Sequence, residues 1–241
     1  MQQEECKMIY VMSDIHGCFE KYEMMKNKIG FSKEDMLYIL GDVVDRGPSG
    51  MKVLLDIAQH ENILLLRGNH DLQAMFLLSR LQGLYEDEPQ KELVEAYQAW
   101  FSDGGSATVE EYLTLSEEEK ALVLKVLGNS LMKQTLEING NRFLLAHTVP
   151  EVDVICDFDE WSWEAYLYGE PDYEEIYFDD TYVVTGHTPT QYIDCKYNGK
   201  IWMGNHHIAV DCGAVFGNPL GCICLDTFET YYVDESISLI K

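Results

Sequence analysis

The sequence predicts an α/β fold in which helices cover a parallel sheet, and three observations support this. Short apolar runs at residues 8–12, 36–40 and 63–66 have the composition of buried parallel strands. Amphipathic stretches separate these runs, which gives the strand–helix alternation of a parallel sheet. A polar motif follows each run, at the strand end where ligands bind in such sheets.

The helices between these strands have recognisable faces and boundaries. Residues 17–29 predict an amphipathic helix with four apolar side chains turned inward: Phe19, Tyr22, Met25 and Ile29. Residues 48–59 predict a second helix, because Pro48 and Ser49 are typical opening residues and the following apolar positions are spaced for one face. A third helix is expected to begin at Asp71.

The segment after the third strand has a different character, because it contains only helical patterns. Four stretches there have helical spacing: residues 72–81, 91–101, 106–113 and 116–127. Ser116 and Glu119 form a capping box at the start of the last one. No linker composition separates this part from the rest. We therefore expect a single domain over residues 1–241, with a helical insertion at about 72–130.

Strand patterns return in the last part of the chain. Residues 134–138 and 142–145 flank Asn139-Gly140-Asn141, which predicts a hairpin. A further short strand is expected at residues 182–185. Three more runs are expected to form a terminal antiparallel set: residues 207–211, 221–226 and 230–234.

Composition excludes several classes of function. The chain has 17 basic and 42 acidic residues and a formal net charge of −25. Such a surface repels phosphate backbones, so we expect no nucleic-acid partner. No apolar run is long enough to span a membrane, and the first residues do not resemble a signal peptide. Seven scattered cysteines without a CxxC pair indicate thiols and a cytoplasmic location.

The three polar motifs carry the chemistry of the chain. Residues 13–17 read Ser-Asp-Ile-His-Gly, residues 41–47 read Gly-Asp-Val-Val-Asp-Arg-Gly, and residues 68–71 read Gly-Asn-His-Asp. Each places metal-ligating side chains directly after a predicted strand. The carboxyl ends of parallel strands meet at one edge, so the motifs predict a dinuclear metal site on one sheet.

These motifs alone leave a dinuclear site short of ligands. Asp14 and His16 stand two residues apart and can reach one ion, whereas Asp42 has two oxygens and can bridge to a second. Two later histidines also follow apolar strands and precede a threonine. A lone histidine in such a place is more often structural, but the incomplete site favours ligation here. The predicted ligands are Asp14, His16, Asp42, Asn69, His147 and His187.

The mixture of nitrogen and oxygen ligands indicates the kind of metal. Such a set suits Mn²⁺, Fe²⁺ or Zn²⁺ better than Ca²⁺. Two such ions about 3.5–4 Å apart clamp a phosphoryl group and supply a hydroxide nucleophile at neutral pH. We expect two divalent transition-metal ions, with manganese as the first choice and iron or zinc as alternatives.

The three motifs, followed in order by His147 and His187, resemble those of the metallophosphoesterases of the serine/threonine phosphoprotein phosphatase (PPP) superfamily. They are most similar to those of the bacterial and phage members and of the related diadenosine tetraphosphatases. The resemblance covers residues 8–75, 142–150 and 182–213 most densely. It implies a four-layer α/β/β/α sandwich. It also implies that Asp14, His16 and Asp42 hold one metal, whereas the second is held by Asp42, Asn69, His147 and His187.

The same resemblance implies three catalytic residues. Arg46 would grip phosphate oxygens with its planar guanidinium. His70 would protonate the leaving oxygen, and Asp45 would hold the His70 ring in the productive tautomer. The alternatives are a plain surface ion pair between Asp45 and Arg46, and a structural role for His70 at a helix start.

One departure from the family pattern leaves the substrate open. Bacterial and phage members often carry a second phosphate-binding Arg, and Trp163 stands at that position here. No Lys or Arg occurs between Thr148 and Gly186, so Arg46 works alone or Arg142 or Lys196 approaches from elsewhere. Four aromatic residues near this position form either core or a stacking surface for a base: Trp161, Trp163, Tyr166 and Tyr168. The adjacent pair His206-His207 is expected to be structural.

Three functions are consistent with these residues. The first is a metal-dependent serine/threonine protein phosphatase, which hydrolyses phosphomonoesters of a phosphoprotein or a phosphorylated small molecule. The alternative is a dinucleoside polyphosphate hydrolase, which the missing Arg and the aromatic segment favour. A non-catalytic metal-binding or partner-binding protein is the third, and the complete ligand set argues against it. No membrane partner is expected.

Overall fold

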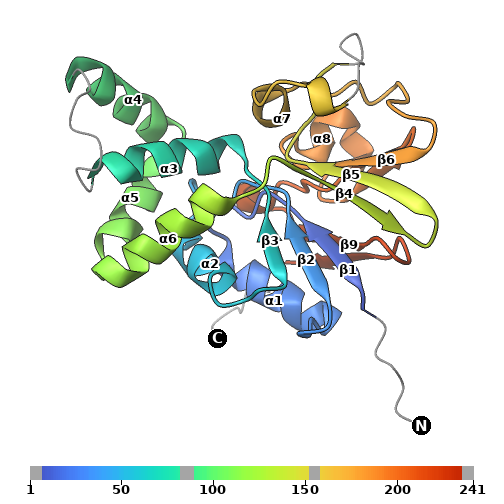
Figure 1. Ribbon diagram of the computed structural model, residues 1–241, viewed down its shortest axis with the longest axis horizontal. Coiled ribbons are helices and arrows are strands. Elements are labelled where there is room, and N and C mark those ends of the chain that lie inside the picture. Colours follow the sequence, from blue (N-terminus) through green and yellow to red (C-terminus); the bar gives the residue numbers. More distant parts are fainter. Residues whose placement is uncertain (1–6, 82–89, 152–157, 235–241) are drawn as a thin grey trace.

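The computed structural model describes residues 7–81, 90–151 and 158–234, and it contains two five-stranded sheets (Figure 1). The first sheet has the strand order β10-β9-β1-β2-β3. Its strands are β1 (Ile9–Met12), β2 (Met36–Ile39), β3 (Ile63–Leu65), β9 (Leu220–Cys224) and β10 (Thr230–Val233). Strands β1, β2 and β3 are parallel, as the apolar runs predict, and β9 and β10 add an antiparallel edge beside β1.

The second sheet has the order β4-β5-β6-β8-β7. Its strands are β4 (Lys133–Ile138), β5 (Asn141–Ala146), β6 (Thr181–Thr185), β7 (Trp202–Gly204) and β8 (His207–Ala209). The hairpin between β4 and β5 forms as predicted, with Asn139 and Gly140 at positive φ. The expected terminal antiparallel set is wrong for β8, which pairs in parallel with β6. Ile208 of β8 packs in the apolar cluster between the two sheets.

Helices cover the outer faces of the two sheets. They are α1 (Phe19–Ile29), α2 (Gly50–Ile57), α3 (Asn69–Leu81), α4 (Gln90–Ser102), α5 (Gly105–Leu113), α6 (Glu117–Asn129), α7 (Ala165–Tyr168) and α8 (Thr190–Ile193). Figure 1 shows α3–α6 gathered beside the first sheet, with α7 and α8 beyond the second. Helix α3 begins two residues earlier than predicted, so Asn69, His70 and Asp71 all lie in its first turn.

Alternating side chains of the strands build the layers. In β1, Tyr10 and Met12 pack with the helices, whereas Val11 packs between the sheets. In β9, Cys222 and Cys224 both face the helices and Ile223 faces the second sheet, as the spacing predicts. Residues from both sheets meet in the central cluster, including Leu40, Leu66, Phe143, Leu145, Val184 and Ile208. The four-layer α/β/β/α arrangement is therefore confirmed.

The outer face of the second sheet carries its own small core. Leu144 and Val183 pack there against Trp161 and Tyr166. Trp163 and Tyr168, by contrast, are 52% and 54% exposed. The aromatic segment thus divides into two core residues and two surface residues. His207 is buried and shares a 2.8 Å hydrogen bond with Thr185, which is the expected structural role.

Two further expectations concern cysteines and membranes. Five cysteines lie in the described part of the chain and carry thiols rather than disulfides: Cys18, Cys195, Cys212, Cys222 and Cys224. Cys6 and Cys156 lie outside the described residues. Among the described helices, none combines the length and the apolar composition needed to cross a membrane.

Candidate active site

The candidate site lies where strands from both sheets end. Asp14 and His16 follow β1, Asp42 follows β2, and His147 and His187 follow β5 and β6. The prediction of a site on one sheet is therefore incomplete, because its last two histidines come from the second sheet. Because the two sheets pack against each other, the ends of β1, β2, β5 and β6 lie close together. The order of the motifs along the sequence does not reveal this.

The turns that carry these residues have an unusual backbone. Ten described residues other than glycine have positive φ, and six of them are predicted site residues: Asp14, His16, Asp42, Asp45, Arg46 and His187. L-residues avoid this region, and such strain concentrates at functional sites. At Gly68, a Cβ atom would overlap the Asp42 carboxylate, so only glycine fits there. These turns thus adopt an unfavourable backbone conformation, which directs their side chains into the site.

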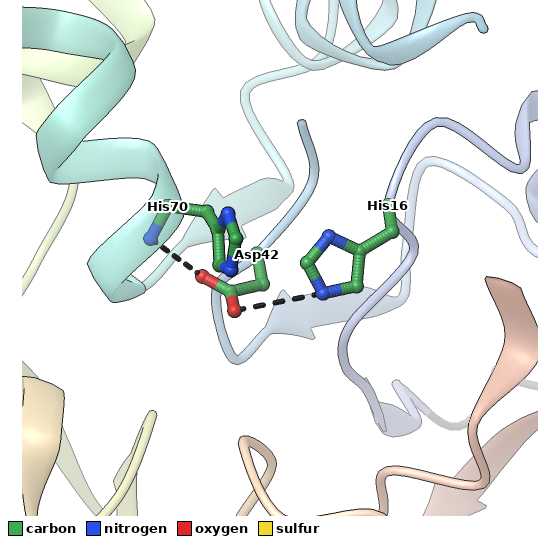
Figure 2. A group of neighbouring side chains, drawn as sticks. All are labelled: His16, Asp42 and His70. Atoms are coloured by element: carbon green, nitrogen blue, oxygen red, sulfur yellow. Dashed lines mark hydrogen bonds and ion pairs between the residues drawn. The ribbon is translucent and has the colours of Figure 1, made fainter. Parts of the chain in front are cut away.

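Asp42 stands at the centre of the site. Figure 2 shows its carboxylate between the side chains of His16 and His70, which arrive from different turns. Oδ2 of Asp42 lies 3.7 Å from Nε2 of His16, and Oδ1 accepts a 3.1 Å hydrogen bond from the His70 backbone. Potential ligand atoms of these three residues all lie within 4.8 Å of one another, which is close enough to surround one cation.

A second group of ligands shares the same carboxylate. Asp42, His147 and His187 also offer ligand atoms within 4.8 Å of one another. Nε2 of His147 lies 3.0 Å from Oδ1 of Asn69 and 3.0 Å from Nδ1 of His187. Because Asp42 belongs to both groups, it is placed to bridge two ions, as a dinuclear site requires.

Hydrogen bonds set the histidine rings in the form that binds metals. Nδ1 of His16 donates to the Val44 carbonyl, and Nδ1 of His147 donates to the Leu40 carbonyl. Each ring therefore keeps an Nε2 lone pair for the centre of the site. Burial lowers the pKa of His16 and of His187 to about 4, so both rings are neutral at pH 7.

Buried carboxylates surround the same point. Asp14, Asp42, Asp71 and Asp211 are all almost fully buried. Burial, together with neighbouring carboxylates, raises the pKa of Asp71 and of Asp211 to about 7, and it raises the pKa of Asp14 well above its usual value. Acids packed so closely are stabilised by cations. With the neutral imidazoles, they form a donor set that fits two divalent metal ions.

A hydrogen-bonded pair lies beside the first group of ligands. Nδ1 of His70 donates to Oδ2 of Asp45 at 2.7 Å, and both side chains are buried. Burial lowers the pKa of His70, but the Asp45 hydrogen bond and the Asp42 charge outweigh that effect, so the pKa lies above its usual value. The structure thus brings together the predicted pair in the tautomer that leaves Nε2 of His70 facing the site.

Asp45 is held by residues that sequence reasoning missed. Nε1 of Trp100 donates to its Oδ2 at 2.8 Å, and the Thr108 hydroxyl donates to its Oδ1 at 2.6 Å. The same hydroxyl accepts a 2.9 Å hydrogen bond from the Asp45 backbone. Both residues belong to the helical segment 72–130. No local motif marks either residue as part of a site.

The Arg46 guanidinium lies against the His16 and His70 rings. Its Nη1 lies 2.7 Å from Nε2 of His16, and its Nη2 lies 2.9 Å from Nε2 of His70. Nη2 also donates to Oδ1 of Asp103 at 3.2 Å, and the other oxygen of Asp103 lies 3.6 Å from Nε2 of His70. Arg46 is therefore not a plain surface ion pair with Asp45, and Asp103 is a further acid that the sequence did not indicate.

Two buried acids complete the supports of the site. Asp71 accepts hydrogen bonds from the backbones of Gly68, Asp42 and Val43, so it ties the second motif to the third. Asp211 lies close enough to Asp14 to affect its pKa, which burial raises most. A signal for Asp211 exists in the sequence, because it follows an apolar run just as Asp14 does. Neither acid belongs to the predicted set of site residues.

The structure does not supply a second phosphate-binding Arg from the suggested positions. Arg142 begins β5, whereas His147 follows the other end of that strand, and Arg142 pairs with Asp180 at 2.9 Å. Lys196 pairs with Asp194 at 2.7 Å rather than with a predicted site residue. The suggestion that Arg142 approaches the site is therefore wrong.

Two exposed aromatic residues lie on segments next to predicted site residues. The Phe216 ring is 58% exposed and its centroid lies 5.6 Å from Cζ of Arg46. Tyr168 ends α7, and the next residue, Gly169, accepts a 2.9 Å hydrogen bond from the hydroxyl of Thr148, which directly follows His147. Burial and then the Asp42 charge raise the pKa of Tyr168.

Known proteins resemble this chain, one over nearly its whole length and another over about a third of it. A bis(5'-nucleosyl)-tetraphosphatase PrpE [asymmetrical] from Geobacillus sp. (strain WCH70) is 24% identical over 261 aligned positions, which cover 96% of each chain. A symmetrical bis(5'-nucleosyl)-tetraphosphatase from Wigglesworthia glossinidia brevipalpis is 34% identical over 89 positions, which cover 36% of this chain and 33% of that protein.

Solved structures show the same fold. A protein proposed to be a diadenosine tetraphosphatase superposes with a TM-score of 0.64 at 17% identity, over 96% of this chain and 95% of that one. A protein serine/threonine phosphatase from Saccharomyces cerevisiae gives 0.54 at 15% identity, over 92% and 74%. Residues 7–191 match the family of calcineurin-like phosphoesterases. The chain therefore belongs to the calcineurin-like phosphoesterases, a family of metal-dependent hydrolases.

Proposed function

We propose that this chain hydrolyses dinucleoside tetraphosphates with the help of two divalent metal ions. The observation that carries the hydrolytic part is the pair of ligand groups that share Asp42, beside the hydrogen-bonded His70 and Asp45. The full-length likeness to proteins named bis(5'-nucleosyl)-tetraphosphatases supports the substrate. The proposal therefore adopts the alternative function, a dinucleoside polyphosphate hydrolase, in place of the serine/threonine protein phosphatase.

The ligand set suggests how the metals would be held. Asp14, His16 and Asp42 would bind one ion, and the second would lie between Asp42, Asn69, His147 and His187. Such ions polarise a phosphoryl group and lower the pKa of water in contact with them. Nitrogen and carboxylate ligands in this mixture suit manganese, and they also suit iron or zinc. The scattered thiols favour the cytoplasm as the place of this reaction.

Three residues beside the metals would handle the substrate. Arg46 would hold the phosphoryl oxygens, because its guanidinium lies next to both His16 and His70. His70 would donate a proton from Nε2 to the leaving phosphate, while Asp45 keeps its ring oriented through Nδ1. The chain has no second Arg near these groups at the positions considered above. Contacts to the bases of the substrate would supply part of the binding energy that a second Arg provides in bacterial and phage members of the family.

The exposed aromatic rings fit a substrate with two bases. The Phe216 ring lies beside Arg46, and Tyr168 directly precedes Gly169, whose carbonyl accepts a hydrogen bond from Thr148 next to His147. An exposed ring offers a face on which a base can stack, which is worth about 1–3 kcal/mol per base. A phosphopeptide has no group that needs two such faces.

A direct comparison of substrates tests the proposal. With Mn²⁺ present, we expect rapid conversion of diadenosine tetraphosphate into ATP and AMP, the products of asymmetrical cleavage, when followed by chromatography. A phosphoserine peptide should be hydrolysed much more slowly. Faster turnover of the peptide, without cleavage of the dinucleotide, would contradict the proposed substrate and restore the protein phosphatase.

A variant of Phe216 sharpens the same test. Phe216→Ala should raise KM for diadenosine tetraphosphate about fivefold or more, because a stacking contact is lost, and should leave KM for p-nitrophenyl phosphate unchanged. Phe76 on α3 is also an exposed ring, but it contacts Arg80, so Phe76→Ala is the matched control. Equal KM values for the dinucleotide in all three proteins would exclude Phe216 from base binding.

A further inference from the structure

We propose that Trp100 and Thr108 are positioning residues that hold Asp45 in the orientation in which it directs the proton of His70. This inference rests on the proposed function, because it assigns a task to a proton donor that the proposed hydrolysis uses. It gives the helical segment 72–130 a part in the reaction. Neither residue touches the candidate metal ligands through the contacts described here.

The contacts of Asp45 are the first ground for the inference. Its carboxylate receives three hydrogen bonds, from the His70 ring, the Trp100 indole and the Thr108 hydroxyl, at 2.7, 2.8 and 2.6 Å. Two of them end on Oδ2 and one on Oδ1, so both oxygens are fixed. A carboxylate held in this way cannot rotate about its Cβ–Cγ bond without breaking a buried hydrogen bond.

The backbone of Asp45 is held from the same side. Asp45 has a φ of +67°, a conformation that an aspartate adopts at a cost. Its backbone N–H donates to the Thr108 hydroxyl, and the next backbone N–H, of Arg46, donates to the Gly104 carbonyl at 3.1 Å. The helical segment therefore fixes both the main chain and the side chain of the residue that orients His70.

The loop between α4 and α5 is shaped for this contact. Gly104 has a φ of +101°, and a Cβ atom there would lie 2.7 Å from Cγ of Arg46. At Gly105 a Cβ atom would overlap the Trp100 ring. Only glycine at these two positions lets the loop approach Arg46 and Asp45 so closely. The close approach places Trp100 and Thr108 on either side of one carboxylate.

The consequence is specific to proton transfer. Without its hydrogen bonds to Trp100 and Thr108, the Asp45 carboxylate would still balance the positive charge of His70. It would no longer fix the direction in which Nε2 of His70 points. Donation to the leaving oxygen depends on that direction. Metal binding depends on other side chains and should be unaffected. The effect should thus be large for a substrate whose leaving group needs a proton and small for one whose leaving group does not.

Two aryl phosphates of different leaving ability test the inference. Thr108→Val keeps the shape of the side chain but removes the hydroxyl, and it should lower kcat for phenyl phosphate about tenfold. The same variant should change kcat for p-nitrophenyl phosphate less than twofold, because p-nitrophenolate leaves without a proton. Neither KM nor the bound metal should change. Thr108→Ser restores the hydroxyl and should restore the rate.

Controls separate this inference from the proposed function and from a folding defect. Thr114 lies at the end of α5, where its hydroxyl bonds only to the Glu111 carbonyl among the described contacts, so Thr114→Val should behave as wild type. An equal loss for both substrates in Thr108→Val would contradict the inference, as would no loss at all. Full activity of His70→Asn with phenyl phosphate would instead overturn the proposed role of His70 itself. Trp100→Phe, which removes the indole donor and keeps a smaller aromatic ring at this buried position, provides the independent second variant and should show the same split between substrates.

Discussion

The two halves of the candidate site are built in different ways. The half with the candidate metal ligands consists of turns that follow strands of both sheets, together with Asn69 in the first turn of α3. The half with Asp45, His70 and Arg46 also depends on the helical segment 72–130, which supplies Trp100, Asp103 and Thr108. The first half comes from the sheets themselves, so its geometry depends on strand pairing. The geometry of the second half depends on how one helical segment packs. A change in that packing can therefore alter the substrate and the rate without altering the sheets.

The largest effect should come from the residue common to both ligand groups. Asp42→Asn removes one negative oxygen from the centre of the site, so we expect loss of both ions and of detectable turnover. Substitution of a residue that only hydrogen-bonds to a metal ligand already lowers metal affinity about 10–100-fold, and substitution of a bridging ligand should lower it more. Elemental analysis and turnover of p-nitrophenyl phosphate measure the two effects. Asp194→Asn, at an exposed acid paired with Lys196, is the control. Two ions retained with full activity would show that the two groups do not form one centre.

A change in the other half should reduce the rate and leave the metals bound. His70→Asn removes the proposed proton donor but leaves the predicted ligands in place, so we expect kcat for phenyl phosphate, whose leaving group needs a proton, to fall about 10²–10⁴-fold. The metal content should equal that of the wild type. Simultaneous loss of metal and activity would mean that His70 is a ligand, which the grouping of His16, Asp42 and His70 also permits geometrically.

The difference between the halves explains what the sequence could reveal. Strand-end motifs are short, so Asp14, His16 and Asp42 could be identified from the apolar runs before them. His147 and His187 lie far along the chain, but they follow the same rule and were found by counting ligands. Their origin in a second sheet could not be seen, because periodicity predicts a strand and not the sheet to which it belongs.

The supporting residues were beyond the reach of local patterns. Trp100 and Thr108 lie in amphipathic helical stretches, where aromatic and threonine residues are usual, and their contact with Asp45 follows only from how α4 and α5 pack. The strand 207–211 was misplaced for a related reason. Its apolar residues suit either sheet, and only the parallel pairing of β6 with β8 decides the matter. Asp211 is the exception, since its strand-end position was a usable signal.

The smallest effect tests whether the helical segment also regulates the binding of phosphate. Asp103 pairs with Arg46 at 3.2 Å and lies 3.6 Å from Nε2 of His70, where the proposed substrate phosphate would bind. Asp103→Asn removes a competing negative charge. The pair is partly exposed and therefore worth about 0.2–1 kcal/mol, so inorganic phosphate should inhibit about 1.4- to fivefold more strongly.

The salt dependence of that inhibition provides the matching check. The gain in Asp103→Asn should shrink at high salt, because exposed charges are screened. Asp180 forms a similar exposed pair with Arg142, but at the far end of β5, so Asp180→Asn should leave inhibition by phosphate unchanged. Weaker inhibition in Asp103→Asn would mean that the acid orients Arg46 for the substrate rather than competing with it. In that case the helical segment would assist both proton transfer and phosphate binding, and the contrast between the two halves of the site would be greater still.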